Sequence, residues 1–251
     1  MALAPANTFG GAPLLSQLAQ LGFAAERQSK ATLADTLADL IDLSDSITLT
    51  KSLAKLARVK TEFGAGDRRS AESEFLNTRA GILRFIQESF KPGDAGAPFL
   101  LPAATAETLT NASEGMQPYQ RFYSLHQSEM DFRIGKLRGA LRKVLSGHNL
   151  AGARLAALDQ ILNDTIGDHS RRILATLPRL LGQHFKTLRQ DFVSSRDDAI
   201  DSDPDSWTQP GEWLDRFNQD MRHLLVTELD FRLLPLRGLL DALDTQEDRL
   251  L

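Results

Sequence analysis

Cysteine is absent from the 251 residues, and valine, tyrosine and tryptophan are scarce, at four, two and two residues. The absence of cysteine excludes disulfides, thiol catalysis and cysteine-ligated metal sites. Strands favour branched and aromatic side chains, whereas helices favour leucine, alanine and straight-chain residues. Because 42 leucines stand against four valines, the composition predicts an all-α protein.

Long hydrophobic runs are also missing. No apolar run approaches the roughly 18–20 residues that are needed to span a bilayer. The first basic residue is Arg27, and no continuous apolar leader precedes it. We therefore expect no transmembrane segment and no secretory signal, and the lack of cysteine fits a cytoplasmic protein.

Catalytic and nucleotide-binding motifs are lacking as well. The segment GAGDRR at 64–69 has two glycines but no preceding strand and no third glycine, so it indicates a turn rather than a phosphate loop. No G-x-S-x-G elbow occurs. The five histidines include no pair at i+3 or i+4, and only Asp220 and His223 share a helical face. We expect no enzyme activity, no cofactor, no metal and no small-molecule substrate.

The chain divides by composition. Residues 92–112 contain the clearest break, with prolines and glycines clustered at its start, which is typical of a linker. We predict five parts: a disordered lead-in at 1–12, an N-terminal helical region at 13–91, a linker at 92–112, a long-helix bundle at 113–246 and a tail at 247–251. In the N-terminal region, short helices are expected near 13–21, from Thr32, from Ser44 and at 69–90, and they would form a small bundle.

The second half carries longer apolar periodicity. From about 118 to 146, steps of four and three residues mark a heptad seam, whose one polar member is Gln127. The seam consists of Tyr123, Gln127, Met130, Ile134, Leu137, Leu141 and Val144. A second long helix is expected over 150–196, with a kink or short break near Ala175–Pro178. A third is expected over about 211–244, with a bend or restart at Pro235. These segments predict an elongated antiparallel three-helix bundle of coiled-coil character.

A basic stripe follows the first of these long helices. It consists of Arg133, Lys136, Arg138, Arg142 and Lys143. One hypothesis is a surface that binds nucleic acid or anionic lipid. The other is a solvated flank of the seam, placed opposite acidic groups of the C-terminal helix, and the absence of interleaved aromatic residues favours this second interpretation.

The C-terminal helix contains charges inside an apolar stretch. Glu228, Asp230 and Arg232 lie close together in TELDFRLLPLRGLLDAL, and we expect one of them to point inward. An i,i+4 ion pair between Glu228 and Arg232 is the favoured interpretation. The alternative is a polar contact that fixes helix register or docks a partner.

Four segments, taken in order, resemble a proteobacterial all-helical family of unknown function. They cover most of 33–243 and read LADTLADLIDLSDSITLTKSL, YQRFYSLHQSEMDFRIGKLRGAL, RLAALDQILNDTIGDHSRRILATLPRLLGQHFKTLR and MRHLLVTELDFRLLPLRGLLDAL. The resemblance implies a cytoplasmic helical protein that is often encoded beside a proton-channel protein of the MotA/TolQ/ExbB type and an OmpA-like protein. It implies no activity and no functional residues.

The leading hypothesis from the sequence is a non-enzymatic interaction or scaffold protein, an accessory of a bacterial envelope assembly that resembles a motor. Its apolar seams are expected to pair with a protein partner or with a second copy of the chain. The alternative is a helical module associated with nucleic acid through the basic stripe at 133–143.

Overall fold

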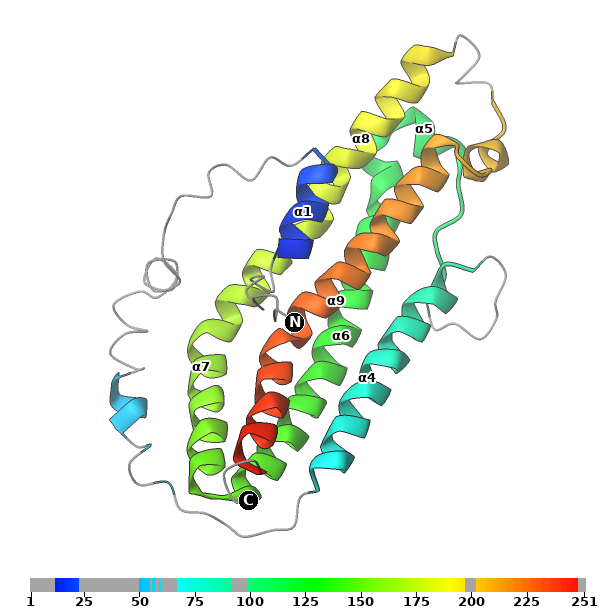
Figure 1. The fold of residues 1–251 in the computed structure, drawn as a ribbon. Helices are drawn as coiled ribbons and strands as arrows, with labels where there is room; N and C mark the ends of the chain where they lie inside the picture. Colours follow the sequence, from blue (N-terminus) through cyan, green and yellow to red (C-terminus); the bar gives the residue numbers. More distant parts are fainter. Residues whose placement is uncertain are drawn as a thin grey trace, which may run out of the picture. The chain divides into compact units, whose positions relative to one another are not determined.

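The computed structural model describes residues 12–22, 50–54, 56, 59, 67–91, 99–196 and 202–247 (Figure 1). All regular secondary structure in these ranges is helical, and none of it is strand. The predicted all-α class is therefore confirmed. The more specific arrangement, a short-helix bundle followed by an elongated three-helix bundle, stays a prediction. The expected lead-in, apart from Ala12, and the helix starts at Thr32 and Ser44 lie outside the described residues.

The helices agree closely with the apolar periodicity of the sequence. Their bounds are α1 Ala12–Gln20, α4 Arg68–Ser89, α5 Ala106–Thr110, α6 Ala112–His148, α7 Leu150–Leu174, α8 Leu177–Ser195, the 3-10 turn η2 Pro204–Thr208, and α9 Trp213–Glu247. The break expected inside 150–196 is present, because α7 ends at Leu174 and α8 begins at Leu177. Pro178 is the second residue of α8, where its missing N–H leaves no intrahelical bond unmade.

Two details differ from expectation. Pro235 lies inside α9, which continues to Glu247 without a restart, and the bend that was the other expectation stays a prediction. The segment expected to be a linker contains the short helix α5. Its start is held by Thr108, whose Oγ1 accepts a hydrogen bond from the backbone N–H of Thr105 at 3.0 Å. A threonine placed three residues after a helix start can satisfy a backbone donor in this way, and composition does not reveal it.

The chain divides into two compact units, each assembled from three segments. Unit 1 consists of Met1–Glu26, Leu83–Ser128 and Pro178–Leu234, and unit 2 consists of Arg27–Ile82, Glu129–Leu177 and Pro235–Leu251. Both flanks of the segment at 92–112 belong to unit 1, and the five-part division predicted from composition stays a prediction. Packing joins the two flanks. The Phe90 ring meets the Phe122 ring edge-on at 5.2 Å, and Leu101 donates its N–H to the Ser89 carbonyl at 2.9 Å.

Unit 1 has an aromatic core. Phe185 is fully buried, and its ring lies 5.1 Å from Phe217 and 5.4 Å from Trp213. Tyr119 closes this group from α6, with its ring 5.5 Å from Phe217. Edge-to-face contacts of this kind add to the hydrophobic effect. They join α6, α8 and α9, and they bring together Tyr119, Phe185 and Trp213, which are 66 and 28 residues apart in the sequence.

Unit 2 is built on the predicted seam of α6. Met130, Ile134, Leu137 and Leu141 are all buried, with at most 8% of each side chain exposed. The last predicted member, Val144, is half-buried, and its neighbour Leu145 is buried instead. The shift by one residue follows from the 3.6-residue period of the helix, which drifts away from a strict heptad.

The turn between α6 and α7 is tight. Asn149 caps α7, and its side chain accepts the N–H of Gly152 at 2.8 Å. A Cβ atom added at Gly152 would lie 2.4 Å from the Leu145 carbonyl oxygen. Glycine is therefore needed where α7 leaves the end of α6. None of the helices in the described ranges combines the length and the apolar character needed to cross a membrane.

Candidate functional site

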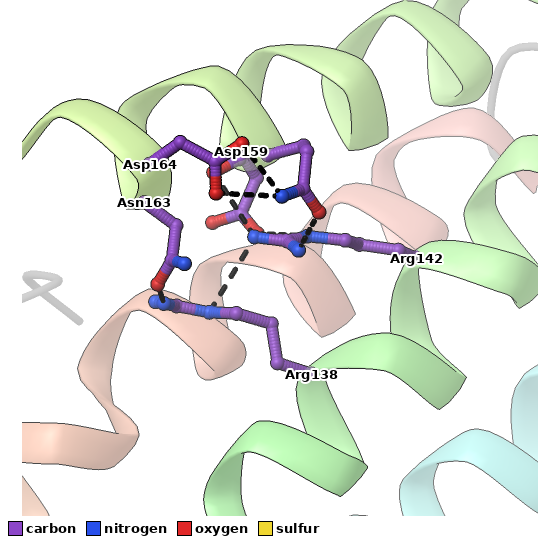
Figure 2. A network of polar contacts seen from close by, with 6 residues as sticks. Arg138, Arg142, Asp159, Asn163 and Asp164 are labelled. Atoms are coloured by element: carbon purple, nitrogen blue, oxygen red, sulfur yellow. Dashed lines mark hydrogen bonds and ion pairs between the residues drawn. The ribbon is translucent and has the colours of Figure 1, made fainter. Parts of the chain in front are cut away.

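Two arginines of the basic stripe on α6 contact α7. Arg142 donates through Nε to Oδ2 of Asp159 at 2.6 Å, and Nε of Arg138 lies 3.6 Å from the same oxygen (Figure 2). The three side chains are 15%, 19% and 13% exposed in the order Arg142, Arg138, Asp159. A carboxylate of α7 therefore engages two arginines of the stripe, and the expectation that acidic groups of the C-terminal helix face the stripe stays a prediction.

Further contacts complete this cluster. Arg142 also donates to the Asp159 carbonyl at 3.1 Å and to the side chain of Gln160. Gln160 is held in turn by Asp164, at 2.7 and 2.8 Å (Figure 2). Arg138 donates to the Oδ1 atom of Asn163. The cluster thus ties two arginines of α6 to one turn of α7.

Arg138 carries the least compensated charge of the cluster. Its buried Nε has no hydrogen-bond partner. Burial lowers the pKa of its guanidinium, and the nearby charges of Arg142 and Arg171 lower it further, whereas Asp159 acts in the opposite direction. One carboxylate shared by two guanidinium groups explains this imbalance.

The stripe is consequently not a continuous cationic surface. Arg133 pairs with Glu129 at 2.6 Å within α6. Lys136 and Lys143 are exposed. Phosphate binding depends on cations that are free to neutralise the nucleic-acid backbone. With Arg138 and Arg142 engaged by Asp159, the geometry does not favour the nucleic-acid hypothesis.

The charged group of the C-terminal helix forms a second cluster, in unit 1. Glu228 is completely buried. Its carboxylate accepts hydrogen bonds from the Tyr123 hydroxyl at 2.6 Å and from Nε2 of Gln127 at 2.9 Å. Arg232 donates through Nε at 2.8 Å and through Nη2 at 2.6 Å. The expected inward-pointing residue is therefore Glu228, and the favoured i,i+4 pair with Arg232 is present.

This second cluster joins two helices by specific polar contacts. Asp230, the third charged residue of this stretch, is exposed. Burial raises the pKa of Tyr123 well above its ordinary value, and the charge of Glu228 and the hydrogen bond to it raise it further. A buried carboxylate that accepts hydrogen bonds from three side chains of α6 and α9 is satisfied only at one relative position of the two helices. The cluster is therefore suited to fixing helix register rather than to proton transfer with a substrate.

A buried serine–histidine pair was not predicted from the sequence. Ser89 Oγ lies 2.8 Å from Nε2 of His126, and Nδ1 of His126 lies 2.8 Å from the Phe122 carbonyl. Both side chains are completely buried. The His126 ring is 5.0 Å from Phe85 and 4.4 Å from Phe122. A nucleophilic serine must be open to its substrate, so this pair acts as a core contact between α4 and α6.

A second histidine contact lies nearer the surface of unit 1. Nε2 of His184 on α8 is 2.8 Å from Oδ2 of Asp220 on α9. His223, which shares a face with Asp220 in sequence, is exposed. Within the described ranges, no three His, Asp or Glu side chains converge to hold a metal ion. The half-site suggested by Asp220 and His223 is instead a helix–helix contact made by His184.

Comparison with known protein families gives a match over most of the chain. The family described as "Protein of unknown function (DUF3348)" matches residues 1–245. The chain belongs to this family. No curated protein sequence and no solved structure matches the chain. Membership of DUF3348 agrees with the resemblance to a family of unknown function and supplies no activity and no site residues.

Proposed function

We propose that this member of DUF3348 is a non-enzymatic interaction protein that docks a helix of a protein partner on α7. The proposal rests on one observation about the apolar stripe of that helix. The α7 stripe consists of Leu155, Leu158, Leu162, Ile166, His169 and Ile173. Leu162 is 38% exposed and Ile173 is 50% exposed, while the other members are half-buried.

The contrast with α6 is informative, because both helices carry apolar residues at steps of three and four. On α6 the residues at this spacing are buried, and Met130 and Leu137 are each 1% exposed. On α7 the buried residues are Gly152, Ala153, Ala156 and Leu174, none of which belongs to the stripe. A helical apolar stripe whose members are half-buried or exposed is the kind of surface that accepts another amphipathic helix.

Site-specific photo-crosslinking tests the proposal. A photoreactive amino acid is placed at Leu162 or at Ile173 and irradiated in cells of the native host. The matched control position is Leu76 on α4, which is also apolar and 56% exposed. We expect crosslinks to a partner chain from both stripe positions and not from Leu76.

Crosslinks of equal strength at Leu76, or none at either stripe position, would contradict the proposal. Sedimentation of the purified chain separates the two kinds of occupant. A doubled mass that Leu162→Asp abolishes would identify a second copy as the occupant, in place of a different protein. Circular dichroism of Leu162→Asp checks that the fold is intact, which we expect because the side chain is already partly exposed.

We extend the proposal to the setting that the family resemblance implies. The partner is then a component of an envelope assembly that contains a MotA/TolQ/ExbB-type channel, and this chain acts on its cytoplasmic side. Tagged chain is purified from detergent-solubilised membranes of the host, with Leu162→Asp as the comparison. Recovery of the channel protein with the wild type alone supports the extension, and its absence from both samples counts against it.

A further inference from the structure

Unit 1 contains a cavity of about 490 Å³ that the proposed helix docking does not use. It is lined by Phe90 and Lys91, which follow α4, by the segment Leu100–Ala104, by η2 and by the first turns of α9. The volume falls within the range of about 300–1,000 Å³ found for small-ligand sites. Because the lining comes from four separate segments, the sequence gives no indication of it.

The walls of this cavity are held by contacts that do not depend on a ligand. Leu101 donates its N–H to the Ser89 carbonyl at 2.9 Å, which fixes the segment that runs along one side. Phe90 is braced by the edge-to-face contact with Phe122. Trp207 anchors η2, since its side chain is 1% exposed. The cavity is thus formed before any ligand arrives.

Opposite charges lie at separate places along the cavity. Asp205 belongs to η2, and Asp215 lies in the first turn of α9. Arg222 follows Asp215 by seven residues, or roughly 10 Å along the helix axis. Asp215 uses only Oδ2 in its contacts with Gly211 N at 2.7 Å and with the Gln219 side chain at 2.8 Å.

The remaining charges of the cavity are uncommitted. Within the described part of the chain, the Asp205 carboxylate, the Arg222 guanidinium and the Lys91 ammonium form no hydrogen bond or ion pair. The cavity therefore offers acidic groups at Asp205 and Asp215 and a basic group at Arg222, about two helical turns beyond Asp215 along α9. A ligand that carries both charges would satisfy both ends.

Amide groups lie between the two charged ends. Asn218 lines the cavity, and its buried Oδ1 has no hydrogen-bond partner. Gln219 lines it one residue further along α9. On the other side, the peptide groups of Ala103 and Ala104 form no backbone hydrogen bond within the described residues. A carboxamide carries the same donor and acceptor as a peptide group, so both sides match an extended main chain.

We propose that this cavity binds a short unblocked peptide of about three residues in an extended conformation. An extended chain advances about 3.3–3.6 Å per residue, so the termini of a tripeptide are separated by roughly the distance from Asp215 to Arg222. The ammonium group lies at Asp205 and Asp215, and the carboxylate lies at Arg222. The peptide groups between them meet Asn218, and apolar side chains contact Phe90 and Leu100.

The test uses the full chain, labelled for NMR, and four defined probes. These are L-alanyl-L-alanyl-L-alanine, its N-acetyl form, its C-terminal amide and free L-alanine. We expect saturable shifts for trialanine at the backbone amides of Leu100, Leu101, Ala103 and Ala104 and at the side-chain amides of Asn218 and Gln219. Each blocked form should bind about tenfold more weakly or worse, since it loses one charged contact. Free alanine, which cannot span the two ends, should be weaker still.

Two variants test which residues of the cavity contact each terminus of the peptide. Arg222→Gln should weaken trialanine binding about tenfold and abolish the preference for trialanine over its amide. Asp205→Asn should reduce the preference for trialanine over the N-acetyl form. The matched control is Arg237→Gln, an exposed arginine of the same helix that does not line the cavity, and its binding should equal that of the wild type.

Several outcomes overturn the inference. They are the absence of any saturable shift, shifts that map outside the cavity, or equal binding of the blocked and unblocked peptides. If N-acetyl-trialanine bound as tightly as trialanine, a free C-terminus would be enough for binding, and Asp205 and Asp215 would have no role in it. The stripe of α7 takes no part in this cavity, so Leu162→Asp should leave trialanine binding unchanged.

Discussion

Tyr123 and Glu228 are 105 residues apart in the sequence, and the tyrosine hydroxyl donates a hydrogen bond of 2.6 Å to the glutamate carboxylate. The bond joins α6 to α9 inside unit 1, where the glutamate is completely buried. A buried charge is tolerated only when its hydrogen-bonding capacity is filled. The position of Glu228 therefore depends on donors from two helices, and the packing of these two helices against each other depends on the glutamate.

Replacing Glu228 with glutamine should destabilise the protein by about 2–4 kcal/mol, because the variant removes a charge that Arg232 needs and turns an NH2 group toward groups that are themselves donors. Urea denaturation followed by circular dichroism measures the change. Asp230→Asn is the control on the same helix, and this exposed position should change the free energy of unfolding by less than about 0.5 kcal/mol. Equal effects at the two positions would contradict the role of the buried cluster.

Alkaline pH should destabilise the protein through its two tyrosines. Burial raises the pKa of both Tyr119 and Tyr123 above the ordinary value of 10.0. A phenol whose pKa is raised on folding keeps its proton in the folded state at a pH where the unfolded chain loses it. Its contribution to the free energy of unfolding is therefore complete below about pH 10 and is lost as the pH rises from about 10 toward the folded pKa. Each tyrosine should lower the free energy of unfolding by about 1.4 kcal/mol per pH unit in this window.

Tyrosinate absorbance near 295 nm provides the measurement. We expect it to appear together with the loss of helical circular dichroism, since the folded tyrosines stay protonated. Tyr123→Phe should reduce the slope against pH by about half relative to the wild type. Tyrosinate that forms while the helical signal is intact would show that the folded pKa values are not raised.

The sequence predicts what depends on local periodicity. The buried positions of α6 from Tyr123 to Leu141 follow from steps of three and four residues, because each turn of a helix returns to the same face. Gln127 could be recognised as the polar member of that seam. Its partner Glu228 could not, since the two residues are 101 positions apart and no periodic signal connects them.

The pair of Glu228 with Arg232 was predictable because its spacing is a property of one helix. The partner of Arg142 was not, since Asp159 reaches it only through the turn at Asn149. The contact between Ser89 and His126 was hidden in the same way, because a segment rich in proline and glycine separates the two residues. Sequence patterns describe single elements, whereas the polar clusters and the cavity depend on how separate elements pack.

The Asp159 carboxylate should be the most sensitive position of the cluster between α6 and α7. Asp159→Asn leaves both Arg138 and Arg142 without their shared anion, and we expect a loss of about 1–3 kcal/mol. Asp164→Asn is the control, because Asp164 is exposed and contacts the cluster only through Gln160. Its effect should stay below about 0.5 kcal/mol.

A double-mutant cycle separates the shared pair from general damage. Combining Asp159→Asn with Arg142→Met should cost less than the sum of the single changes, by about 0.5–3 kcal/mol. Additive losses in urea denaturation would show that the two side chains do not act together. Because Arg142 donates to the Asp159 carbonyl as well as to its carboxylate, some of the contact should survive in the single Asp159→Asn variant.

Two glycines of α6 should respond to alanine in opposite directions. A Cβ atom added at Gly115 would lie 2.5 Å from the Cα atom of Thr108, whereas one added at Gly139 would meet no atom within 4 Å. Gly115→Ala must displace the backbone of α5 and should cost about 1–3 kcal/mol. Gly139→Ala gains helix propensity and should stabilise the protein by up to about 1 kcal/mol.

Thermal unfolding of the two variants beside the wild type provides the comparison. Destabilisation of equal size at both positions would show that α5 does not approach α6 at Gly115 as closely as the structure places it.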